Sequence, residues 1–428
     1  MGTSALLLAG LVVGLANVAS AAKLAVLWRR ENGAMDSLGW DGVACAAVLA
    51  VSASPSPSPR LSIECQLHSR THSHPRPSTL DLTLTFNLAR GLSPPASDAP
   101  RQVNHFNARN GSIAPEFATV PLGLQIEGLY YDAWSTGKDA TIAYRKAIAD
   151  GANAIAGPSR SAQALPVSGL AAIDEVVVVS PWASSPRLSI AAEHPYFSRT
   201  WPDDKMAAGL IMSAMSDFGW KNIGYVGVFD AYADGFKEAM NAWSAVNPGR
   251  AVLNPTPSFP FDNREAARNA VKALKALGTK VNVVIVFDED IYAIMEAADE
   301  LGMLGDEYIW VASDTTSDAS TGTSYIPPGG SAAKLAGWLR GMIRLCFSPE
   351  GEKPAGYQRL QTVWAATTPS DCAFTPNPNN DSSHFVPTQA VFDRVPYDVA
   401  ATMYDAVAVS ALALAASDDP TNGSEARS

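Results

Sequence analysis

The chain has 428 residues, enough for two or three domains and for a large buried core. Its formal net charge of −11 at pH 7 disfavours a surface that binds nucleic acid or an anionic membrane. Neither property selects a function by itself.

The first 21 residues read as a signal peptide. An apolar stretch, Ala5–Val13, precedes a small-x-small cleavage site at Ala19–Ala21. No Lys or Arg precedes the apolar stretch, so an ordinary apolar helix or anchor is the alternative. We expect a secreted protein or one at the extracellular face of a membrane. Its candidate glycosylation sites are the sequons at Asn110, Asn380 and Asn422.

Residues 52–102 are rich in Ser and Pro and lack sustained periodicity. We interpret them as an irregular, disordered insertion, such as an intron translated in frame. Within it, four residues imitate the spacing of metal ligands, but Pro-rich surroundings offer no scaffold for a metal site. We therefore expect no metal and no cofactor. The four residues are Cys65, His68, His72 and His74.

Strand-like and helix-like runs alternate along the chain. Short apolar runs predict buried strands, and amphipathic runs predict helices between them. The alternation predicts parallel sheets with helices on both faces. The predicted strands are residues 23–28, 123–132, 152–158, 176–180, 222–229, 281–287 and 308–313, and the predicted helices are 140–151, 204–220, 235–246, 264–278 and 293–303.

The last long apolar run covers residues 399–416. It contains Asp405 and has helical periodicity, which indicates a packed helix rather than a membrane span. We expect residues 417–428 to form a disordered tail.

Three motifs together point to a known family. One predicted strand runs into a helix start at Gly157–Ser161, the next into the turn Trp182–Ser184, and Pro202–Asp204 leads to a third strand. This order resembles the ligand-binding region of class C receptors, natriuretic-peptide-type receptor cyclases and type I periplasmic (Leu/Ile/Val-type) binding proteins, over residues 104–416. The resemblance implies an α/β fold of the type I periplasmic-binding-protein class. Two Rossmann-like lobes would each hold a parallel sheet, with a ligand cleft between them.

The resemblance also implies how the chain is divided between the lobes. Residues 43–51 and 104–112 match the first helix of the family and its Asn-rich end, so 52–102 would interrupt lobe 1. The expected divisions are a signal peptide (1–21), lobe 1 (22–200), lobe 2 (201–330), a return to lobe 1 (331–416) and the tail (417–428).

A ligand carboxylate fits the helix start at Ser161. Helix N-termini present unpaired N–H groups and a partial positive charge, and a serine hydroxyl adds a donor. Simple N-capping by Ser159 or Ser161 is the alternative. The resemblance places the carboxylate of an amino acid at Ser161, assisted by the N–H groups of Trp182, Ala183 and Ser184.

The matching positions for the ammonium group carry acceptors, negative charge or an aromatic face. Each also has a structural alternative: Asp204 could cap a helix, Tyr232 could belong to the core, and Asp314 could be a turn residue. The resemblance implies that these positions hold the head group of an α-amino acid. They are Ser184, Asp204, Tyr232 and Asp314, together with Ser161.

Other positions bear on the ligand side chain. The basic clamp for the distal carboxylate in glutamate receptors falls near Val43 and Val399, so glutamate is disfavoured. Glu289 falls at a ligand-facing position, which favours a neutral or basic side chain. The alternative for Glu289 is a solvated helix start. Trp182 replaces a small hydroxyl residue and would fill the pocket or stack on the ligand.

No pattern for nucleophilic, zinc or nucleotide chemistry occurs, so we expect no catalytic residues and no enzyme. Of the four cysteines, Cys346 and Cys372 bracket a plausible loop and form the candidate disulfide.

We therefore expect the extracellular ligand-binding domain of a membrane receptor, which closes on a small molecule, an α-amino acid. The alternatives are a solute-binding protein of a transport system and the peptide-binding region of a receptor guanylyl cyclase. The resemblance implies a homodimer through lobe 1. Contact with a membrane would be made only by a receptor part absent from this sequence.

Overall fold

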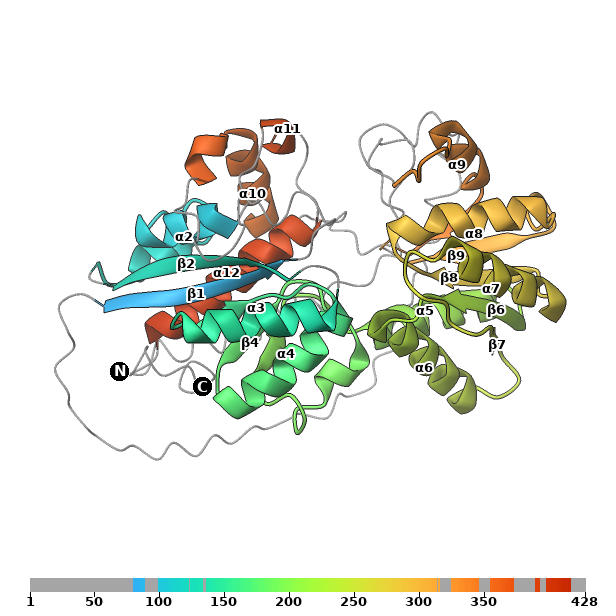
Figure 1. Ribbon diagram of the computed structural model, residues 1–428, viewed down its shortest axis with the longest axis horizontal. Helices are drawn as coiled ribbons and strands as arrows, with labels where there is room; N and C mark the ends of the chain where they lie inside the picture. The colour runs from blue at the N-terminus through green and yellow to red at the C-terminus, as the bar shows by residue number, and fades with distance from the viewer. Residues whose placement is uncertain are drawn as a thin grey trace, which may run out of the picture.

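Two parallel β-sheets, each covered by helices, form the protein, which is described by a computed structural model (Figure 1). The predicted signal peptide, the predicted strand 23–28, Val43 and the predicted tail lie outside the described residues. The structure describes residues 80–88, 99–122, 124–133, 136–313, 315, 325–345, 355–372, 389–392 and 398–416.

The first sheet has the strand order β2-β1-β3-β4-β5, and all its pairs are parallel. The strands are β1 (Leu80–Leu88), β2 (Leu124–Asp132), β3 (Ala154–Ala156), β4 (Val177–Ser180) and β5 (Phe197–Arg199). The helices that pack with it are α2 (Ala99–Asn107), α3 (Gly137–Ala149), α4 (Ser161–Asp174), α10 (Ala355–Ala365), α11 (Gln389–Phe392) and α12 (Asp398–Ala416). We call this unit lobe 1.

Alternate residues of β3 show how both faces of this sheet are buried. Ala154 and Ala156 lie in the apolar cluster that contains Met403 of α12. Ile155, which points to the opposite face, lies in the cluster that contains Tyr144 of α3. A strand buried on both faces requires a continuous apolar run, and that run allowed its prediction from the sequence.

The second sheet has the order β10-β9-β8-β6-β7, again with parallel pairs. Its strands are β6 (Asn222–Gly227), β7 (Val252–Pro255), β8 (Val281–Ile285), β9 (Ile309–Ala312) and β10 (Ile343–Arg344). Its helices are α5 (Asp204–Asp217), α6 (Ala231–Val246), α7 (Arg264–Leu277), α8 (Asp288–Glu300) and α9 (Ala332–Trp338). One apolar core joins all these elements, which we call lobe 2.

The predicted elements that fall on described residues are confirmed. The six strands form β2, β3, β4, β6, β8 and β9, and the five helices form α3, α5, α6, α7 and α8. The run 399–416 is α12, which packs on α2, β3 and β4. In the part of the chain that the structure describes, no helix combines the length and apolar character needed to cross a membrane. The predicted α/β fold class is confirmed.

The expectation that residues 52–102 are irregular throughout is wrong for two segments. Residues Leu80–Leu88 form β1, which lies between β2 and β3, and α2 begins at Ala99. The sequence LDLTLTFNL alternates apolar and polar residues, and this period of two is typical of a strand. Flanking Ser- and Pro-rich stretches obscured this pattern in the sequence.

The expected return to lobe 1 at residue 331 is also placed too early. Strand β10 pairs with β9, and α9 packs against α8, so both belong to lobe 2. Leu335, Met342 and Leu345 are buried in the lobe 2 core. The return therefore falls between Leu345 and α10, whose Trp364 packs in lobe 1. A strand of two residues is too short to give a periodic signal.

The lobes lie side by side (Figure 1). The chain passes from β5 of lobe 1 to α5 of lobe 2. The 3-10 helix η5 (Pro186–Ser189) of lobe 1 packs against α6 of lobe 2, and α4 also packs against α6. The loops after β3 and β4 therefore face lobe 2, as expected for the carboxyl ends of parallel strands.

Candidate functional site

The candidate site starts at the N-terminal turn of α4. Arg160 is the N-cap residue, and Ser161 is the first helical residue, with 2% of its surface exposed. The Gln163 side chain accepts a hydrogen bond from the Arg160 N–H at 3.3 Å. Since neither Ser159 nor Ser161 is the N-cap residue, capping does not explain the serine at position 161.

Ser161 connects this turn to the loop after β4. Its Oγ accepts a hydrogen bond from the Ser185 N–H at 3.1 Å. A hydroxyl that accepts a hydrogen bond still carries a proton to donate. Ser161 thus retains the donor that a carboxylate requires, beside the positive end of the α4 dipole.

Ser180, at the end of β4, fixes the two loops against each other. Its Oγ donates to the Pro158 carbonyl at 2.6 Å and accepts from the Ala183 N–H at 2.9 Å. The Trp182 N–H lies 3.4 Å from the same oxygen. The N–H groups of Trp182 and Ala183, which the resemblance assigned to a ligand carboxylate, point to Ser180 in this arrangement. Ser180 was missed, although a serine that ends a buried strand was a visible signal.

Asp204 lies where the chain enters lobe 2. It is the first residue of α5 and is 2% exposed, and its N–H donates to the Ser184 carbonyl at 3.0 Å. The neighbouring Asp203 is the N-cap residue, because its Oδ1 accepts from the Lys205 N–H at 2.7 Å. The capping alternative for Asp204 is therefore excluded, and a buried carboxyl group remains next to the Ser184 turn.

Tyr232 lies at the start of α6, in an aromatic cluster of lobe 2. Its ring stacks on Phe287 with 5.7 Å between centroids and meets Phe236 edge-on at 5.2 Å. Its hydroxyl is 3.5 Å from Thr315 Oγ1, just beyond β9. The ring thus belongs to the lobe 2 core. Asp314, adjacent to Thr315, lies outside the described residues, and its role stays a prediction.

Arg160 was missed as a site residue, yet its side chain crosses from lobe 1 into lobe 2. Its Cζ lies 3.9 Å from the centroid of the Phe287 ring and 4.8 Å from that of Phe261. One guanidinium nitrogen, Nη2, lies 3.9 Å from Glu289 Oε2. Glu289 therefore faces a basic side chain of the other lobe and is not simply a solvated helix start.

Acidic groups around this guanidinium have perturbed pKa values. Burial raises the pKa of Asp290 to about 7. The hydrogen bond that its Oδ1 accepts from the Asp262 N–H, at 2.9 Å, acts in the opposite direction and lowers this pKa. Burial also raises the pKa of Asp230, the N-cap residue of α6. Desolvation lowers the pKa of Arg160, while Glu289, Asp230 and Asp290 oppose that shift. A guanidinium stays charged under these conditions.

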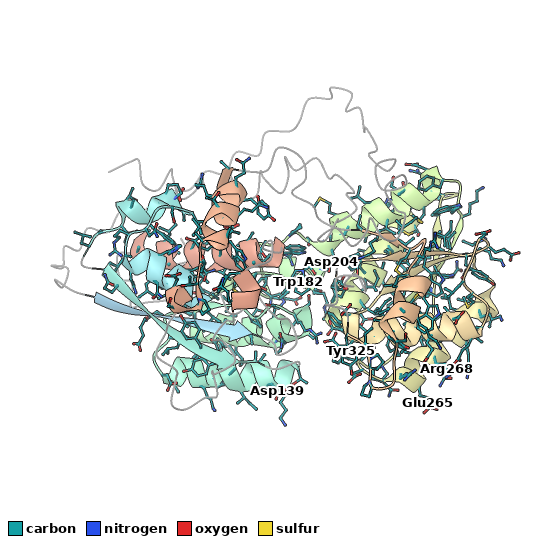
Figure 2. The ribbon with its side chains drawn as sticks, turned by 90° about the horizontal axis from the view of Figure 1, so that it is seen from above. Asp139, Trp182, Asp204, Glu265, Arg268 and Tyr325 are labelled. Carbon is teal, nitrogen blue, oxygen red and sulfur yellow. The ribbon has the colours of Figure 1, made fainter. Side chains whose placement is uncertain are left out.

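The predicted residues thus form two groups at the junction of the lobes. Ser161, Ser184 and Asp204 meet through the loop after β4, whereas Tyr232 and Glu289 lie in lobe 2. Figure 2 shows Trp182 and Asp204 near each other where the lobes meet. The half-buried Trp182 meets Trp201 edge-on, with centroids 6.3 Å apart.

The lobes are also in close contact beside this site. A Cβ added at Gly235 of α6 would lie 2.7 Å from Pro186 Cδ and 3.2 Å from Ser185 Oγ. Only glycine fits there without displacing lobe 1 from lobe 2.

Other candidate positions are only partly described. Cys372 ends the 3-10 helix η7 (Pro369–Cys372), but Cys346 is outside the described residues, so their disulfide stays a prediction. Asn110 is exposed, and its Oδ1 accepts from the Ser112 N–H, whereas Asn380 and Asn422 are not described. The four metal-like residues of the segment 52–102 also lie outside the described residues. Among the residues that are described, no three His, Cys, Asp or Glu side chains gather as metal ligands would.

Two solved structures that resemble the chain are named for leucine or contain it. The leucine-binding protein LivK of Thermotoga maritima aligns with a TM-score of 0.58 at 16% identity, covering 81% of this chain and 87% of that protein. An ABC transporter substrate-binding protein of Desulfitobacterium hafniense, solved in complex with Leu, aligns with a TM-score of 0.53 at 15% identity, covering 81% and 88%. At these identities the likeness establishes the fold.

Two relatives with curated names are a receptor-like protein and a receptor. Metabotropic glutamate receptor-like protein E of Dictyostelium discoideum is 26% identical over 185 residues, and Glutamate receptor 3.2 of Arabidopsis thaliana is 27% identical over 230 residues. The matches cover 40% and 52% of this chain but only 22% and 24% of those receptors. The chain thus spans about a quarter of the length of these relatives.

A family profile matches a larger part of the chain than either relative does. Residues 118–426, which include all described elements from β2 to α12, match the family described as "Receptor family ligand binding region". With the type I periplasmic-binding-protein fold in place, this match shows that the chain belongs to the receptor family ligand-binding region.

Proposed function

We propose that this chain binds an α-amino acid at the junction of its lobes. The observation that carries the proposal is the meeting of the α4 N-terminus at Ser161 with the buried carboxyl group of Asp204, through the loop that contains Ser184. A helix N-terminus favours a carboxylate, and a buried aspartate favours an ammonium group. An α-amino acid carries both groups on one carbon, so it suits two such partners held by one loop.

The proposed role is that of an extracellular ligand-binding domain of a receptor. Ligand that contacts both lobes stabilises the closed arrangement over an open one, and the change in lobe separation is the signal. The similarity to glutamate-receptor-like proteins supports this role. We further propose that the chain is not an enzyme and that it dimerises through lobe 1.

Binding of free amino acids tests the proposal directly. Calorimetry of the secreted protein against the common amino acids should find at least one ligand. Its decarboxylated and deaminated analogues should each bind at least tenfold more weakly, because each leaves one buried partner unfilled. Binding of none of these compounds, or equal binding of ligand and analogues, would contradict the head-group assignment.

Two neighbouring acids provide a matched pair of variants. D204N removes the charge proposed to pair with the ammonium group and should weaken binding at least tenfold. D203N keeps an oxygen that caps α5 but loses the ion pair with Arg199 at 3.1 Å, so it should weaken binding by less than D204N does. Equal affinity of the two variants would count against Asp204 as the ammonium partner.

A second candidate function is ligand delivery to a transporter. The similarity to an ABC transporter substrate-binding protein solved with Leu favours it. Both functions require the same binding site, so binding data do not separate them. A transcript that continues into a membrane span and an effector domain selects the receptor. Binding of a peptide but no amino acid would instead select the peptide-binding region of a receptor cyclase.

A further inference from the structure

The Arg160 side chain is buried in lobe 2, although its backbone belongs to lobe 1. Only 5% of its side-chain surface is exposed. Its guanidinium lies against the Phe287 and Phe261 rings, at 3.9 Å and 4.8 Å from their centroids. Both distances are well within the roughly 6 Å over which an aromatic face attracts a cation.

Carboxyl groups surround the Arg160 guanidinium, but the hydrogen bonding of the guanidinium is incomplete. In the described part of the chain its ion pair is with Glu289, and the 3.9 Å between Arg160 Nη2 and Glu289 Oε2 is longer than a direct hydrogen bond. Within the described residues, Arg160 Nε has no hydrogen-bond partner. The other carboxyl groups that act on it are Asp230 and Asp290. Lobe 2 thus surrounds the cation with aromatic faces and negative charge rather than with a dedicated hydrogen-bonded frame.

We propose that Phe261, Phe287 and Glu289 form a guanidinium-binding site in lobe 2, that Arg160 fills it, and that this internal cation excludes ligands with basic side chains. The exclusion of basic ligands rests on the proposed amino-acid function. It narrows the expected ligand side chain from neutral or basic to neutral.

Exclusion follows from the position of Arg160 beside Ser161. A ligand carboxylate at Ser161 brings the ligand side chain towards the neighbouring lobe 2 surface, where Glu289 already faces Arg160. A second cation there would meet a buried positive charge and would find the aromatic faces covered. Like charges in a desolvated site repel strongly, so lysine and arginine should be poor ligands.

Removing the arginine side chain should open the site to a cation from solution. Ethylguanidinium at millimolar concentration reproduces the missing group, and ethylurea is its uncharged counterpart of similar shape. In titrations followed by calorimetry or NMR, R160A should bind ethylguanidinium saturably and ethylurea at least tenfold more weakly. The wild-type protein should bind neither, and R160A/E289Q should bind ethylguanidinium at least threefold more weakly than R160A. Absence of saturable ethylguanidinium binding to a folded R160A would overturn the proposal.

A measurement on the wild-type protein covers the case in which R160A does not fold. With arginine labelled by ¹⁵N, one Hε resonance should be shifted upfield by the ring current of Phe287, and R160K should remove it. An arginine spectrum without a ring-current-shifted resonance would also overturn the proposal.

Amino-acid titrations separate this proposal from the proposed function. Lysine or arginine should gain at least tenfold in affinity in R160A relative to the wild type, while a neutral ligand gains less. If ethylguanidinium binds R160A but no amino acid binds any variant, the cation site stands and the amino-acid function fails. If amino acids bind the wild type but lysine and arginine bind it as well as neutral ones, specificity through Arg160 fails.

Discussion

The two sides of the junction hold their parts of the site by different means. On the lobe 1 side, hydrogen bonds fix the loops: Ser180 joins the loops after β3 and β4, and Ser161 accepts from Ser185. On the lobe 2 side, Tyr232 and Phe287 stack, and Glu289 supplies charge opposite Arg160. Hydrogen bonds are directional, whereas aromatic and charge interactions tolerate movement. Lobe 1 is therefore suited to orient a ligand and lobe 2 to close on it.

Removal of the Ser180 hydroxyl should give the largest loss of stability, because it removes hydrogen bonds on the lobe 1 side of the junction. S180A leaves the Pro158 carbonyl and the Ala183 N–H without their buried partner, at about 1–3 kcal/mol each. We expect a loss of about 3 kcal/mol in the free energy of unfolding, measured by urea denaturation.

A second buried serine provides the control for S180A. Ser410 in α12 donates only to the Ala406 carbonyl of its own helix, at 2.8 Å. S410A should cost less than about 1 kcal/mol, because the helix still uses that carbonyl. Similar losses for S180A and S410A would contradict the role of Ser180 as the link between the two loops.

The pH dependence of stability tests the lobe 2 side of the junction, through the carboxyl group of Asp290. The folded protein holds a proton on this residue up to a pKa of about 7, whereas the unfolded chain releases it near 3.8. Between these values the folded state binds more protons, so the contribution of Asp290 to stability falls as pH rises towards 7. D290N removes this dependence. As pH rises from 5 to 8, its free energy of unfolding should increase by about 2 kcal/mol relative to that of the wild type.

Urea denaturation of both proteins at several pH values provides the measurement for D290N. The variant keeps an oxygen that accepts from the Asp262 N–H, so the comparison isolates the charge. Identical pH profiles for D290N and the wild type would show that Asp290 ionises normally in the folded protein.

Gly235 tests the contact between the sides, with the smallest expected effect. An added methyl group would lie 2.7 Å from Pro186 Cδ and would hold α6 away from lobe 1. G235A should weaken ligand binding about tenfold, or about 1.4 kcal/mol. It should not lower the stability of lobe 2, because alanine is the better helix former.

Gly209, in α5 of the same lobe, is the matched control. A Cβ at that position would meet Trp243 Cδ1 at 3.7 Å, an ordinary contact. G209A should therefore stabilise lobe 2 by up to about 1 kcal/mol and leave ligand affinity unchanged. Loss of affinity in G209A equal to that in G235A would show that the effect does not arise at the lobe contact.

Much of the fold was predictable because parallel strands buried on both faces, such as Val177–Ser180, appear as short apolar runs. Strand β1 was not predicted, although its period of two was visible, because Pro- and Ser-rich neighbours dominated the composition. Strand β10 has only two residues, and its pairing with β9 depends on tertiary contacts. Local patterns therefore identified the long elements. They missed β1, whose neighbours obscured it, and β10, which is defined by its pairing with β9.

Site residues whose positions follow from a nearby helix start were predictable from the sequence. Side chains that extend from one lobe into the other were not. Ser161 follows from its place at a helix start, and the cap at Asp203 leaves the next aspartate for another role. Arg160 also lies at that helix start, but its burial depends on Phe287, 127 positions later in the chain. No local pattern encodes such a contact, because it exists only when the lobes meet.

The placement of α12 has a consequence for synthesis on the ribosome. Ala406 of this helix packs against Val177 and Val179 of β4, and the Thr402 carbonyl accepts from Thr200 Oγ1, 202 positions earlier. The whole of lobe 2 is translated between these partners. All residues of lobe 2 have thus been synthesised while α12 is still missing from the face of the lobe 1 sheet that it covers. Until α12 emerges, that apolar face lacks its native cover, so we expect lobe 2 to complete its core before lobe 1 does.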